Sequence, residues 1–315
     1  MSLRKEMNAD VIIIGGGAAG ISAALWCDEL KLKSIVLEAG AQLGGQLLRV
    51  FNPIKNHLGI ETENGLELRD IFVRQIENRQ FAVRLQAEII QTDLRNKTVT
   101  LAGGEMLSAA GAVIVATGVQ RGKLNVEGEE RFKERGIIES GKRDAHLVAG
   151  KNVCIVGGGD AALENALIVA EKAEKVYLVH RRADFRGRVE FLERIRVNRK
   201  IEILTDMVVE RISGGECVER IETRNLRNDE RRVLPVEAVL IRIGVTPNTE
   251  MLCGEAELDR NGYVKINSDC ETSIKGVFAV GDVANPVAPT VSSAVGMGAT
   301  AAKAIFALLN SPEKL

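Results

Sequence analysis

The sequence is poor in aromatic residues and has almost no net charge. Phe, Trp and Tyr make up 3% of the 315 residues, and 42 Lys and Arg residues nearly balance 43 Asp and Glu residues. The resulting charge of -1 argues against a nucleic-acid-binding protein, which normally carries a basic excess. With 45% hydrophobic and 27% charged residues, the composition is that of a globular protein, and the length suits two domains.

Long apolar runs and paired cysteines are also lacking. No run approaches the roughly 20 residues needed to cross a bilayer, so we expect no membrane-spanning segment. The N-terminal residues MSLRKEMNAD lead into an apolar run without a small-residue cleavage site, which does not fit a signal peptide. The five cysteines, at positions 27, 154, 217, 253 and 270, are not spaced as a metal or redox pair. We therefore expect a protein of the reducing cytoplasm, without a metal site.

Glycine, in contrast, is abundant, and two glycine clusters mark an internal repeat. The first copy, DVIIIGGGAAGISAAL, has an apolar strand, then Gly15, Gly17 and Gly20, then an Ala-rich helix. The second copy, NVCIVGGGDAALENAL, has the same order with Gly157 and Gly159, and its third small residue is Ala. The first Gly allows a tight turn, the second lets a pyrophosphate approach the backbone, and the third residue lets helix and strand pack closely. The repeat predicts two dinucleotide-binding sites.

After each glycine cluster the sequence follows the same course. A second strand (SIVLEAG or KVYLVHRR) is followed by a β-rich stretch, near 87–101 or 201–224, and then by a returning strand (AVIVATG or AVLIRIG). The remaining C-terminal tail belongs to neither copy and is expected to complete the first. The predicted fold class is α/β, with two Rossmann-like dinucleotide-binding domains, the second inserted in the first. We place the first domain at 1–117 and 246–315, and the second at 118–245.

The residue that ends the second strand indicates which nucleotide each domain binds. In the first copy it is Glu38, whose carboxylate can accept hydrogen bonds from ribose hydroxyls. In the second copy it is His180, followed by Arg181, Arg182 and, one loop on, Arg186. Guanidinium groups bind a 2′-phosphate through charge-assisted hydrogen bonds, so we predict NADPH there and a nucleotide with a free 2′-hydroxyl in the first domain. A solvated basic turn is the alternative for this arginine cluster.

These and other motifs together resemble a known family. The matching motifs are GGGAAG, GGQL, ATG, GGGDAALE, HRRADFR, GVTPNT and GVFAVGD. Across nearly its whole length the chain resembles the low-molecular-weight, bacterial-type thioredoxin reductases. The resemblance implies FAD in the first domain, NADPH in the second, and a homodimer.

The resemblance and the repeat together define two sets of site residues. The expected FAD site comprises Gly15, Gly17, Ala18, Ala19, Gly20, Glu38, Ala39, Gly44, Gly45, Gln46, Asn56, Thr117, Gly118, Gly281, Asp282, Thr290 and Val291. The expected NADPH site comprises Gly157, Gly159, Asp160, Ala161, His180, Arg181, Arg182, Arg186, Ile243 and Gly244. Asp282 ends an apolar strand, where it would bind the ribityl chain of the flavin or, alternatively, cap the next turn. The following segment, from Pro289, is expected to be a helix with its N-terminus directed at the flavin; Gly296 and Gly298 indicate close packing against cofactor, backbone or another helix.

The chain departs from the family at its redox motif. The Cys-x-x-Cys-Asp of the thioredoxin reductases aligns with SGKRD at 140–144, where Ser140 and Arg143 replace the two cysteines. A hydroxyl and a guanidinium cannot form a disulfide, so the family's thiol relay cannot operate through them. Of the remaining cysteines, Cys253 and Cys270 are the least implausible pair. Pro289 with its neighbour Thr also stands where the family usually has Arg-Gln beside the flavin.

Three functions are compatible with these features. The first is an NADPH oxidoreductase whose FAD passes electrons to an external acceptor, which resembles the thioredoxin-reductase-like ferredoxin/flavodoxin–NADP reductases. The second is a thioredoxin or disulfide reductase that uses cysteines of a partner or an unrecognised arrangement of its own. The third is a redox sensor that binds flavin and NADPH. Lys142 and Arg143 would help an acidic ferredoxin or flavodoxin to dock, or belong to a solvated linker.

Overall fold

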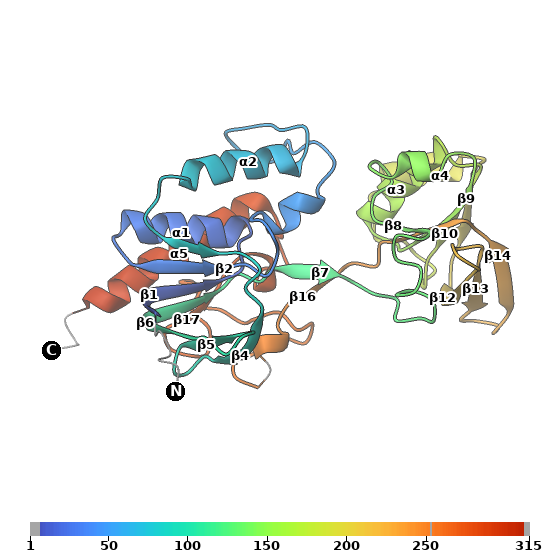
Figure 1. Ribbon diagram of the computed structural model, residues 1–315. Coiled ribbons are helices and arrows are strands. Elements are labelled where there is room, and N and C mark those ends of the chain that lie inside the picture. Colours follow the sequence, from blue (N-terminus) through green and yellow to red (C-terminus); the bar gives the residue numbers. More distant parts are fainter. Residues whose placement is uncertain (1–6, 253, 312–315) are drawn as a thin grey trace. The chain divides into compact units, whose positions relative to one another are not determined.

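The computed structural model describes residues 7–252 and 254–311. The chain forms two compact units, one of Met1–Gln120 with Thr246–Leu315 and the other of Arg121–Val245 (Figure 1). The chain passes from the first unit to the second after Gln120, a few residues beyond the predicted boundary at 117. It returns to the first unit after Val245, at the predicted position. At the crossings the chain forms two short strands that pair with each other, β7 (Val119–Arg121) and β16 (Val245–Pro247).

The first unit is built on a seven-stranded sheet. Its order is β3-β2-β1-β6-β5-β4, with β17 beside β6. The strands β3, β2, β1, β6 and β17 pair in parallel, whereas β4 and β5 form an antiparallel extension. Since β17 comes from the C-terminal tail, the tail supplies a strand to this sheet. The strands are β1 (Met7–Ile14), β2 (Ser34–Leu37), β3 (Ala82–Arg84), β4 (Ile89–Asp93), β5 (Thr98–Leu101), β6 (Met106–Val115) and β17 (Val277–Ala279).

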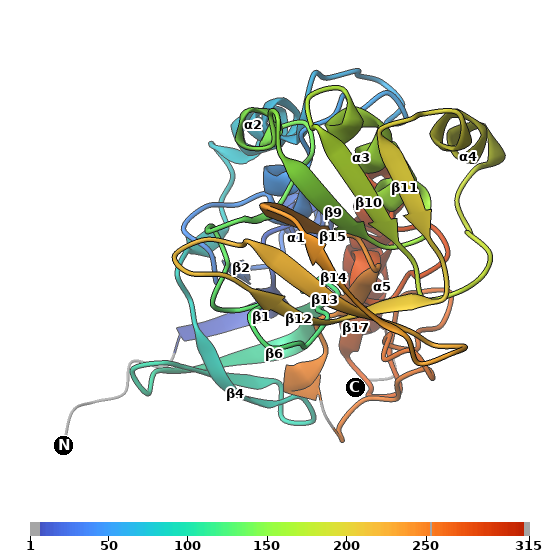
Figure 2. The ribbon, with the colours of Figure 1, turned by 90° about the vertical axis from the view of Figure 1, so that its right-hand side faces the viewer.

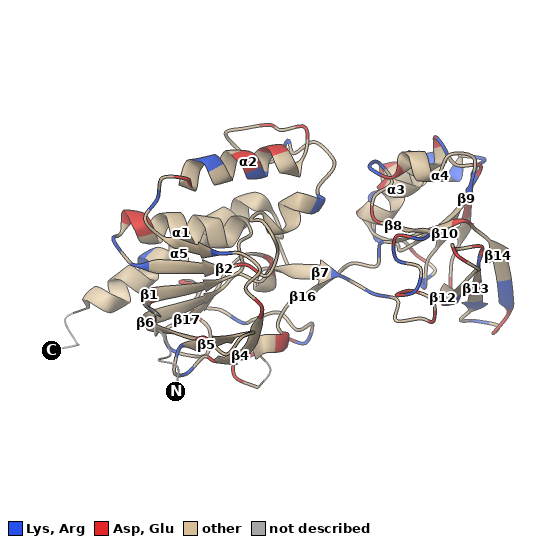
Figure 3. Cartoon of the chain, in the orientation of Figure 1, with Lys and Arg blue, Asp and Glu red and all other residues tan. Residues whose placement is uncertain are grey.

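Two helices of the first unit pack tightly on each other. A Cβ built on Gly298 of α5 would lie 2.4 Å from the carbonyl oxygen of Ala19 in α1, so this glycine permits backbone contact between the helices. A Cβ on Gly296 would meet no atom within 4 Å, so this glycine has no such packing role. Acidic residues occur in α1 only at its C-terminal end (Figure 3). The helices are α1 (Ala18–Glu29), α2 (Gly65–Ile76), α5 (Val291–Asn310) and the short 3₁₀ helices η1 (Gly45–Arg49), η3 (Glu250–Leu252) and η4 (Gly281–Val283).

The expectation that no segment approaches the length of a membrane span is wrong for α5. This 20-residue helix is long and apolar enough to cross a membrane by length and composition alone. In the structure one of its faces is buried, at Ala294, Gly298, Ala301, Ala302 and Ile305. Core helices that pack in this way pass the same test of length and composition.

The second unit repeats the parallel sheet in a smaller form. Its order is β11-β10-β9-β15-β8, all parallel, and a separate antiparallel sheet has the order β12-β13-β14. Figure 2 shows β9, β10 and β11 side by side, with α3 and α4 nearby. The helices are α3 (Asp160–Ala170), α4 (Val189–Arg196) and η2 (Ala145–Leu147). The strands are β8 (Ile137–Ile138), β9 (Asn152–Val156), β10 (Lys175–Val179), β11 (Ile201–Leu204), β12 (Met207–Ser213), β13 (Arg220–Asn225), β14 (Arg231–Pro235) and β15 (Ala238–Ile241).

The strand that leads into each glycine cluster, β1 or β9, is buried on both faces. In β1, Val11, Ile12 and Ile13 are fully buried, and in β9 Val153, Cys154 and Ile155 are. Strands covered by helices on one side and by further chain on the other are expected to be continuously apolar. This explains why both apolar runs were visible in the sequence. The predicted α/β class with two Rossmann-like units is confirmed.

Candidate functional site

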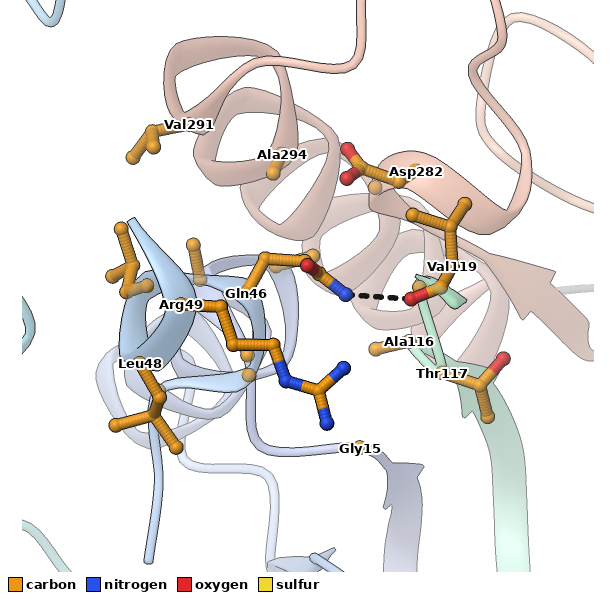
Figure 4. Close-up of a pocket in the computed structure, with 18 of the residues that line it drawn as sticks. Gly15, Gln46, Leu48, Arg49, Ala116, Thr117, Val119, Asp282, Val291 and Ala294 are labelled. Atoms are coloured by element: carbon orange, nitrogen blue, oxygen red, sulfur yellow. Dashed lines mark hydrogen bonds between the residues drawn. The ribbon is translucent and has the colours of Figure 1, made fainter. Parts of the chain in front are cut away.

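A cavity of about 660 Å³ opens in the first unit at the ends of β1, β6 and β17 (Figure 4). This volume lies within the usual range of ligand and cofactor sites. Its walls come from the turn after β1, the 3₁₀ helix η1, the chain after β6, η4 and the N-terminus of α5. Parallel sheets bind ligands at the carboxyl ends of their strands, so the cavity is where the fold predicts a dinucleotide.

The glycines of the first turn have different roles. A Cβ on Gly15, whose φ is +108°, would lie 2.3 Å from the carbonyl oxygen of Ala116, and a Cβ on Gly20 would lie 1.9 Å from that of Gly15. These two glycines therefore allow strand and helix to pack closely. A Cβ on Gly17 would meet only the Cα of Gly45, at 3.8 Å, so the protein itself leaves room there for a ligand. Gly17 is also the N-cap of α1 and provides no side-chain cap, which leaves the first amides of the helix available to an anion.

The carboxylate of Glu38 is held at the edge of the cavity by two backbone amides. One carboxylate oxygen accepts a hydrogen bond from Gly16 N–H at 2.7 Å, and the other accepts one from Gly40 N–H at 2.7 Å. Each oxygen has a second lone pair for a ligand hydroxyl. A fixed carboxylate of this kind at the end of β2 suits the ribose of a dinucleotide with a free 2′-hydroxyl.

Asp282 lies in η4, directly after the buried strand β17. The preceding Gly281 has a φ of +75°, which turns the chain so that the Asp282 side chain lines the cavity. Burial raises the pKa of Asp282. No hydrogen bond from another described residue satisfies this carboxyl group, so its oxygens are available to the hydroxyl groups of a polyol chain such as the ribityl group of FAD.

Polar side chains tie together the chain segments around the cavity. The amide of Gln46 donates to the carbonyl oxygen of Val119 at 2.6 Å (Figure 4). Thr117 and Asn248 bond each other twice: the Thr117 hydroxyl donates to Asn248 O at 2.7 Å, and the Asn248 amide donates to Thr117 O at 2.8 Å. Asn248 was missed as a site residue, although it lies within the GVTPNT motif. Its position follows from long-range contacts, which the local pattern does not contain.

The structure brings most of the predicted FAD residues to this cavity. Those that line it are Gly15, Gly17, Ala18, Ala19, Glu38, Gly44, Gly45, Gln46, Thr117, Gly118, Gly281, Asp282, Thr290 and Val291. Three do not: Gly20 is buried in α1 against the carbonyl oxygen of Gly15, while Ala39 and Asn56 are exposed outside the lining. The sequence also did not reveal that residues 47–50, in and directly after η1, and residues 40–42 line the cavity. The binding of FAD by these residues stays a prediction.

The second unit has an equivalent glycine turn after β9, and its glycines have the same two roles, close packing and open space for a ligand. Gly157 has a φ of +150°, and a Cβ there would lie 2.1 Å from the carbonyl oxygen of Arg242. A Cβ on Gly159 would meet no atom within 4 Å, so this glycine leaves open space above the turn. Gly159 is the N-cap of α3 and provides no side-chain cap. Asp160 follows it and accepts a hydrogen bond from Arg188 N–H at 2.7 Å. Ala161 comes next in the first turn of the helix.

His180 follows the last residue of β10 and packs against the glycine turn. It is buried, one ring nitrogen lies 3.1 Å from Asp184 O, and the ring stacks on Phe185 with centroids 4.9 Å apart. A Cβ on Gly158 would lie 2.2 Å from this ring, so imidazole and turn are in close contact. Burial lowers the pKa of His180, and the neighbouring arginines, Arg182 first among them, lower it further. A neutral, packed imidazole is a support rather than a phosphate-binding cation.

The arginines that follow His180 are differently placed. Arg181, Arg182 and Arg186 are exposed, and none forms an ion pair with a residue in the described ranges. The backbone N–H of Arg186 donates to Gly158 O at 2.8 Å, which fixes this loop against the glycine turn. Ile243 and Gly244 are exposed at the end of β15, where Gly244 has a φ of +104° and open space around it. The edge of the second sheet thus combines a free helix N-terminus with unpaired guanidinium groups, which is the charge pattern that a phosphorylated nucleotide requires.

The SGKRD segment is held by its aspartate. Asp144 is buried and accepts hydrogen bonds from Glu139 N–H at 2.9 Å and Ser140 N–H at 3.1 Å. Arg143 donates to the same carboxylate through Nε at 2.5 Å and Nη2 at 2.9 Å. Burial alone would raise the pKa of Asp144, but the bonds from Arg143 and the two amides lower it. The Ser140 hydroxyl in turn accepts from Arg143 N–H at 3.2 Å. The segment is a closed polar turn, with no group that can be reduced.

The cysteines do not restore a thiol relay within the described residues. Cys27, Cys154 and Cys270 are buried, and all the cysteines that the structure describes are free thiols. Burial raises the pKa of Cys27 to about 12 and that of Cys270 to about 11, and it also raises that of Cys154. Thiols that do not ionise are poor nucleophiles. Cys217 is exposed and alone, and Cys253 lies outside the described residues, so its pairing with Cys270 stays a prediction. The described residues also hold no group of three or more His, Cys, Asp and Glu that could bind a metal ion.

Comparison with known proteins agrees with this geometry. The sequence profile of the pyridine nucleotide-disulphide oxidoreductases matches residues 9–298. The chain is 35% identical over 299 residues to a thioredoxin reductase of Mycolicibacterium smegmatis, covering 93% of this chain and 94% of that protein.

Solved structures agree as well. The thioredoxin reductase of Lactococcus lactis matches with a TM-score of 0.82 and 27% identity, over 96% of this chain and 99% of that one. The thioredoxin reductase of T. acidophilum matches with a TM-score of 0.81 and 26% identity, over 97% of this chain and 100% of that one. The chain therefore belongs to the pyridine nucleotide-disulphide oxidoreductase family and is an FAD-dependent NAD(P)H oxidoreductase of the thioredoxin reductase type.

Proposed function

We propose that this protein is an NADPH oxidoreductase in which electrons leave the FAD directly for an external acceptor, without a thiol relay of the chain itself. The observation that carries the proposal is the state of residues 140–144. Where thioredoxin reductases have a redox cysteine pair, this chain has Ser140 and Arg143, both engaged in the closed turn around Asp144.

The residues of the first unit fit FAD. Gly17 leaves room that no protein atom fills, the first amides of α1 are uncapped, and the carboxylate of Glu38 is fixed at the cavity edge. We expect the α1 amides to hold the phosphates, Glu38 the adenosine ribose and Asp282 the ribityl chain. When bound, FAD supplies the capacity to accept a hydride from NADPH and to release electrons singly or in pairs.

The residues of the second unit fit NADPH. Gly159 leaves open space at the turn for the pyrophosphate. Arg181, Arg182 and Arg186 lie in the loop that Arg186 N–H ties to Gly158 O, and their guanidinium groups form no ion pair with the described residues. His180 keeps the arginine loop in register with the glycine turn through its contacts with Gly158 and the loop backbone. We expect these contacts to select the 2′-phosphate of NADPH over the hydroxyl of NADH.

The acceptor that we favour is an acidic one-electron carrier of the ferredoxin or flavodoxin type. A carrier of this type needs no thiol on the reductase, and it suits an enzyme whose flavin is the last redox group of the chain. Lys142 is exposed beside the closed turn and is available to an acidic partner. We expect the protein to work as a homodimer in the cytoplasm, as the resemblance to the bacterial-type reductases implies.

A second function is favoured by the comparisons. The relatives that match over nearly the whole chain are thioredoxin reductases. For this chain the same activity would require thiols of a partner or an unrecognised arrangement of its own cysteines, of which Cys253 and Cys270 are the least implausible pair. A cofactor-binding redox sensor is the third alternative. The hypotheses differ in whether turnover needs a thiol and whether turnover occurs at all.

The experiment compares acceptors before and after the thiols are blocked. The purified holoprotein is alkylated with N-ethylmaleimide and assayed with NADPH against ferredoxin, flavodoxin, ferricyanide, or thioredoxin with a disulfide substrate. We expect reduction of a carrier protein at the same rate before and after alkylation, and the same result for a Cys217→Ser, Cys253→Ser variant. Thioredoxin reduction that alkylation abolishes would establish the second function instead, and the absence of turnover with every acceptor would favour the sensor.

A further inference from the structure

The cavity of the first unit is deficient in positive charge. Three charged side chains line it in the described part of the chain: Glu38, Arg49 and Asp282. Two of these are carboxylates, and FAD adds an anionic diphosphate. Because like charges repel strongly in a partly enclosed site, the bound dinucleotide needs a cation near its phosphates. Arg49 is the one cationic side chain that the described lining offers.

Arg49 is well placed for this role. It is the last residue of η1, and this helix begins in contact with the N-cap of α1, since a Cβ on Gly45 would lie 3.0 Å from the Cα of Gly17. In Figure 4 the Arg49 side chain extends into the cavity, in the direction of Gly15 in that view. Its guanidinium makes no hydrogen bond or ion pair with any residue that the structure describes.

We propose that Arg49 binds the diphosphate of the dinucleotide, opposite the uncapped amides of α1. The helix N-terminus provides a partial positive charge and backbone donors, and there is no acidic residue in its first turn. The guanidinium adds a full charge and a planar fork of donors that matches phosphate oxygens. In this arrangement the backbone amides of α1 would bind the diphosphate from one side, and the Arg49 side chain would bind it from the other.

The assignment adds a residue that the matching motifs do not include. The GGQL motif ends at Leu47, and Arg49 lies two positions beyond it in the same helix. The inference rests on the placement of FAD in the first unit and does not depend on which acceptor receives the electrons. A failure of carrier reduction would leave it untouched.

The experiment measures FAD affinity and not turnover. The full-length apoprotein is titrated with FAD, followed by the quenching of flavin fluorescence, at low and high NaCl, and then with ADP as a competitor. We expect Arg49→Met to raise the Kd for FAD about 10- to 100-fold and to weaken ADP in parallel, with Arg49→Lys in between. The wild-type Kd should rise with salt more steeply than that of Arg49→Met. Arg74→Met, an exposed change on α2, is the matched control and should change neither affinity.

Two results would overturn the proposal. An Arg49→Met protein that binds FAD and ADP as tightly as the wild type would show that the guanidinium does not touch the diphosphate. Unchanged ADP affinity together with a shifted flavin midpoint potential would place it at the isoalloxazine ring instead. Circular dichroism verifies that each variant folds. If Arg49→Met does not fold, Arg49→Lys decides: a weaker affinity supports the proposal, and an unchanged affinity with a salt-insensitive wild type contradicts it.

Discussion

The two glycine turns of this chain share a backbone design and differ in the charge that follows it. In both, the first glycine avoids a collision with a carbonyl oxygen, of Ala116 or of Arg242, and the second leaves open space. In the first unit the next strand ends in Glu38, whose carboxylate is fixed by two amides. In the second it ends in the buried His180 and exposed arginines. We therefore expect the fold to determine where a dinucleotide lies, and a few residues at the end of one strand to determine which dinucleotide it is.

The largest expected effect separates the two roles of glycine within one turn. Gly157→Ala would force a non-glycine residue to a φ of +150°, with its Cβ 2.1 Å from Arg242 O, so we expect a loss of about 2–4 kcal/mol in the free energy of unfolding. Gly159→Ala meets no protein atom, so it should leave this free energy nearly unchanged while it weakens NADPH at least about 10-fold. Urea denaturation and NADPH titration measure the two quantities. Equal destabilisation by both substitutions would refute the division of roles.

The next effect tests the arginines. Replacing Arg181 and Arg182 together by Ala removes two charge-assisted contacts, so we expect the Kd for NADPH to rise about 100-fold and that for NADH to stay within about twofold. Calorimetric titration of the two nucleotides measures this selectivity. Arg199→Ala, an exposed change near the end of α4, is the control for a general loss of positive charge. A parallel loss for both nucleotides would mean that the loop does not contact the 2′-phosphate.

A smaller effect is expected at the acidic strand end. The carboxylate of Glu38 accepts hydrogen bonds from the backbone N–H groups of Gly16 and Gly40. In Glu38→Gln the side-chain NH₂ would face one of these two N–H groups, so one hydrogen bond is lost. We expect the Kd for FAD to rise about 10-fold, because a neutral amide is a weaker acceptor for ribose hydroxyls than a carboxylate. Fluorescence titration of the apoprotein measures it. Unchanged affinity would mean that Glu38 only shapes the turn.

The smallest effect is the pH dependence that His180 gives to the stability of the second unit. Burial holds the pKa of His180 below its usual value, so as the pH falls below about 6.5 the unfolded chain takes up a proton that the folded chain resists. Stability should therefore decrease on acidification through this range, and His180→Gln should reduce the decrease. Urea midpoints at pH 7 and pH 5 measure it, with the exposed His146→Gln as control. An identical pH profile for wild type and His180→Gln would contradict the neutral, supporting role.

Local patterns predicted the fold well, because the strands that hold both sites are buried runs next to obligatory glycines. The residues that the sequence did not reveal reach the site from a distance. Asn248 forms hydrogen bonds with Thr117, although the whole second unit separates the two residues in the sequence. The position of Arg49 in the cavity depends on the contact between η1 and Gly17. The length of the apolar segment in α5 was likewise underestimated, because it becomes evident only once the helix boundaries are known.

The central claim is that the flavin is the last redox group of the chain, and an anaerobic titration with NADPH tests it most directly. The holoprotein is titrated while flavin absorbance and free thiols are followed together. We predict complete bleaching of the flavin at about one NADPH per FAD, with no new thiols, because the segment at residues 140–144 has nothing to reduce. Uptake of a second equivalent, accompanied by the appearance of two thiols, would reveal a disulfide in electronic contact with the flavin and contradict the account.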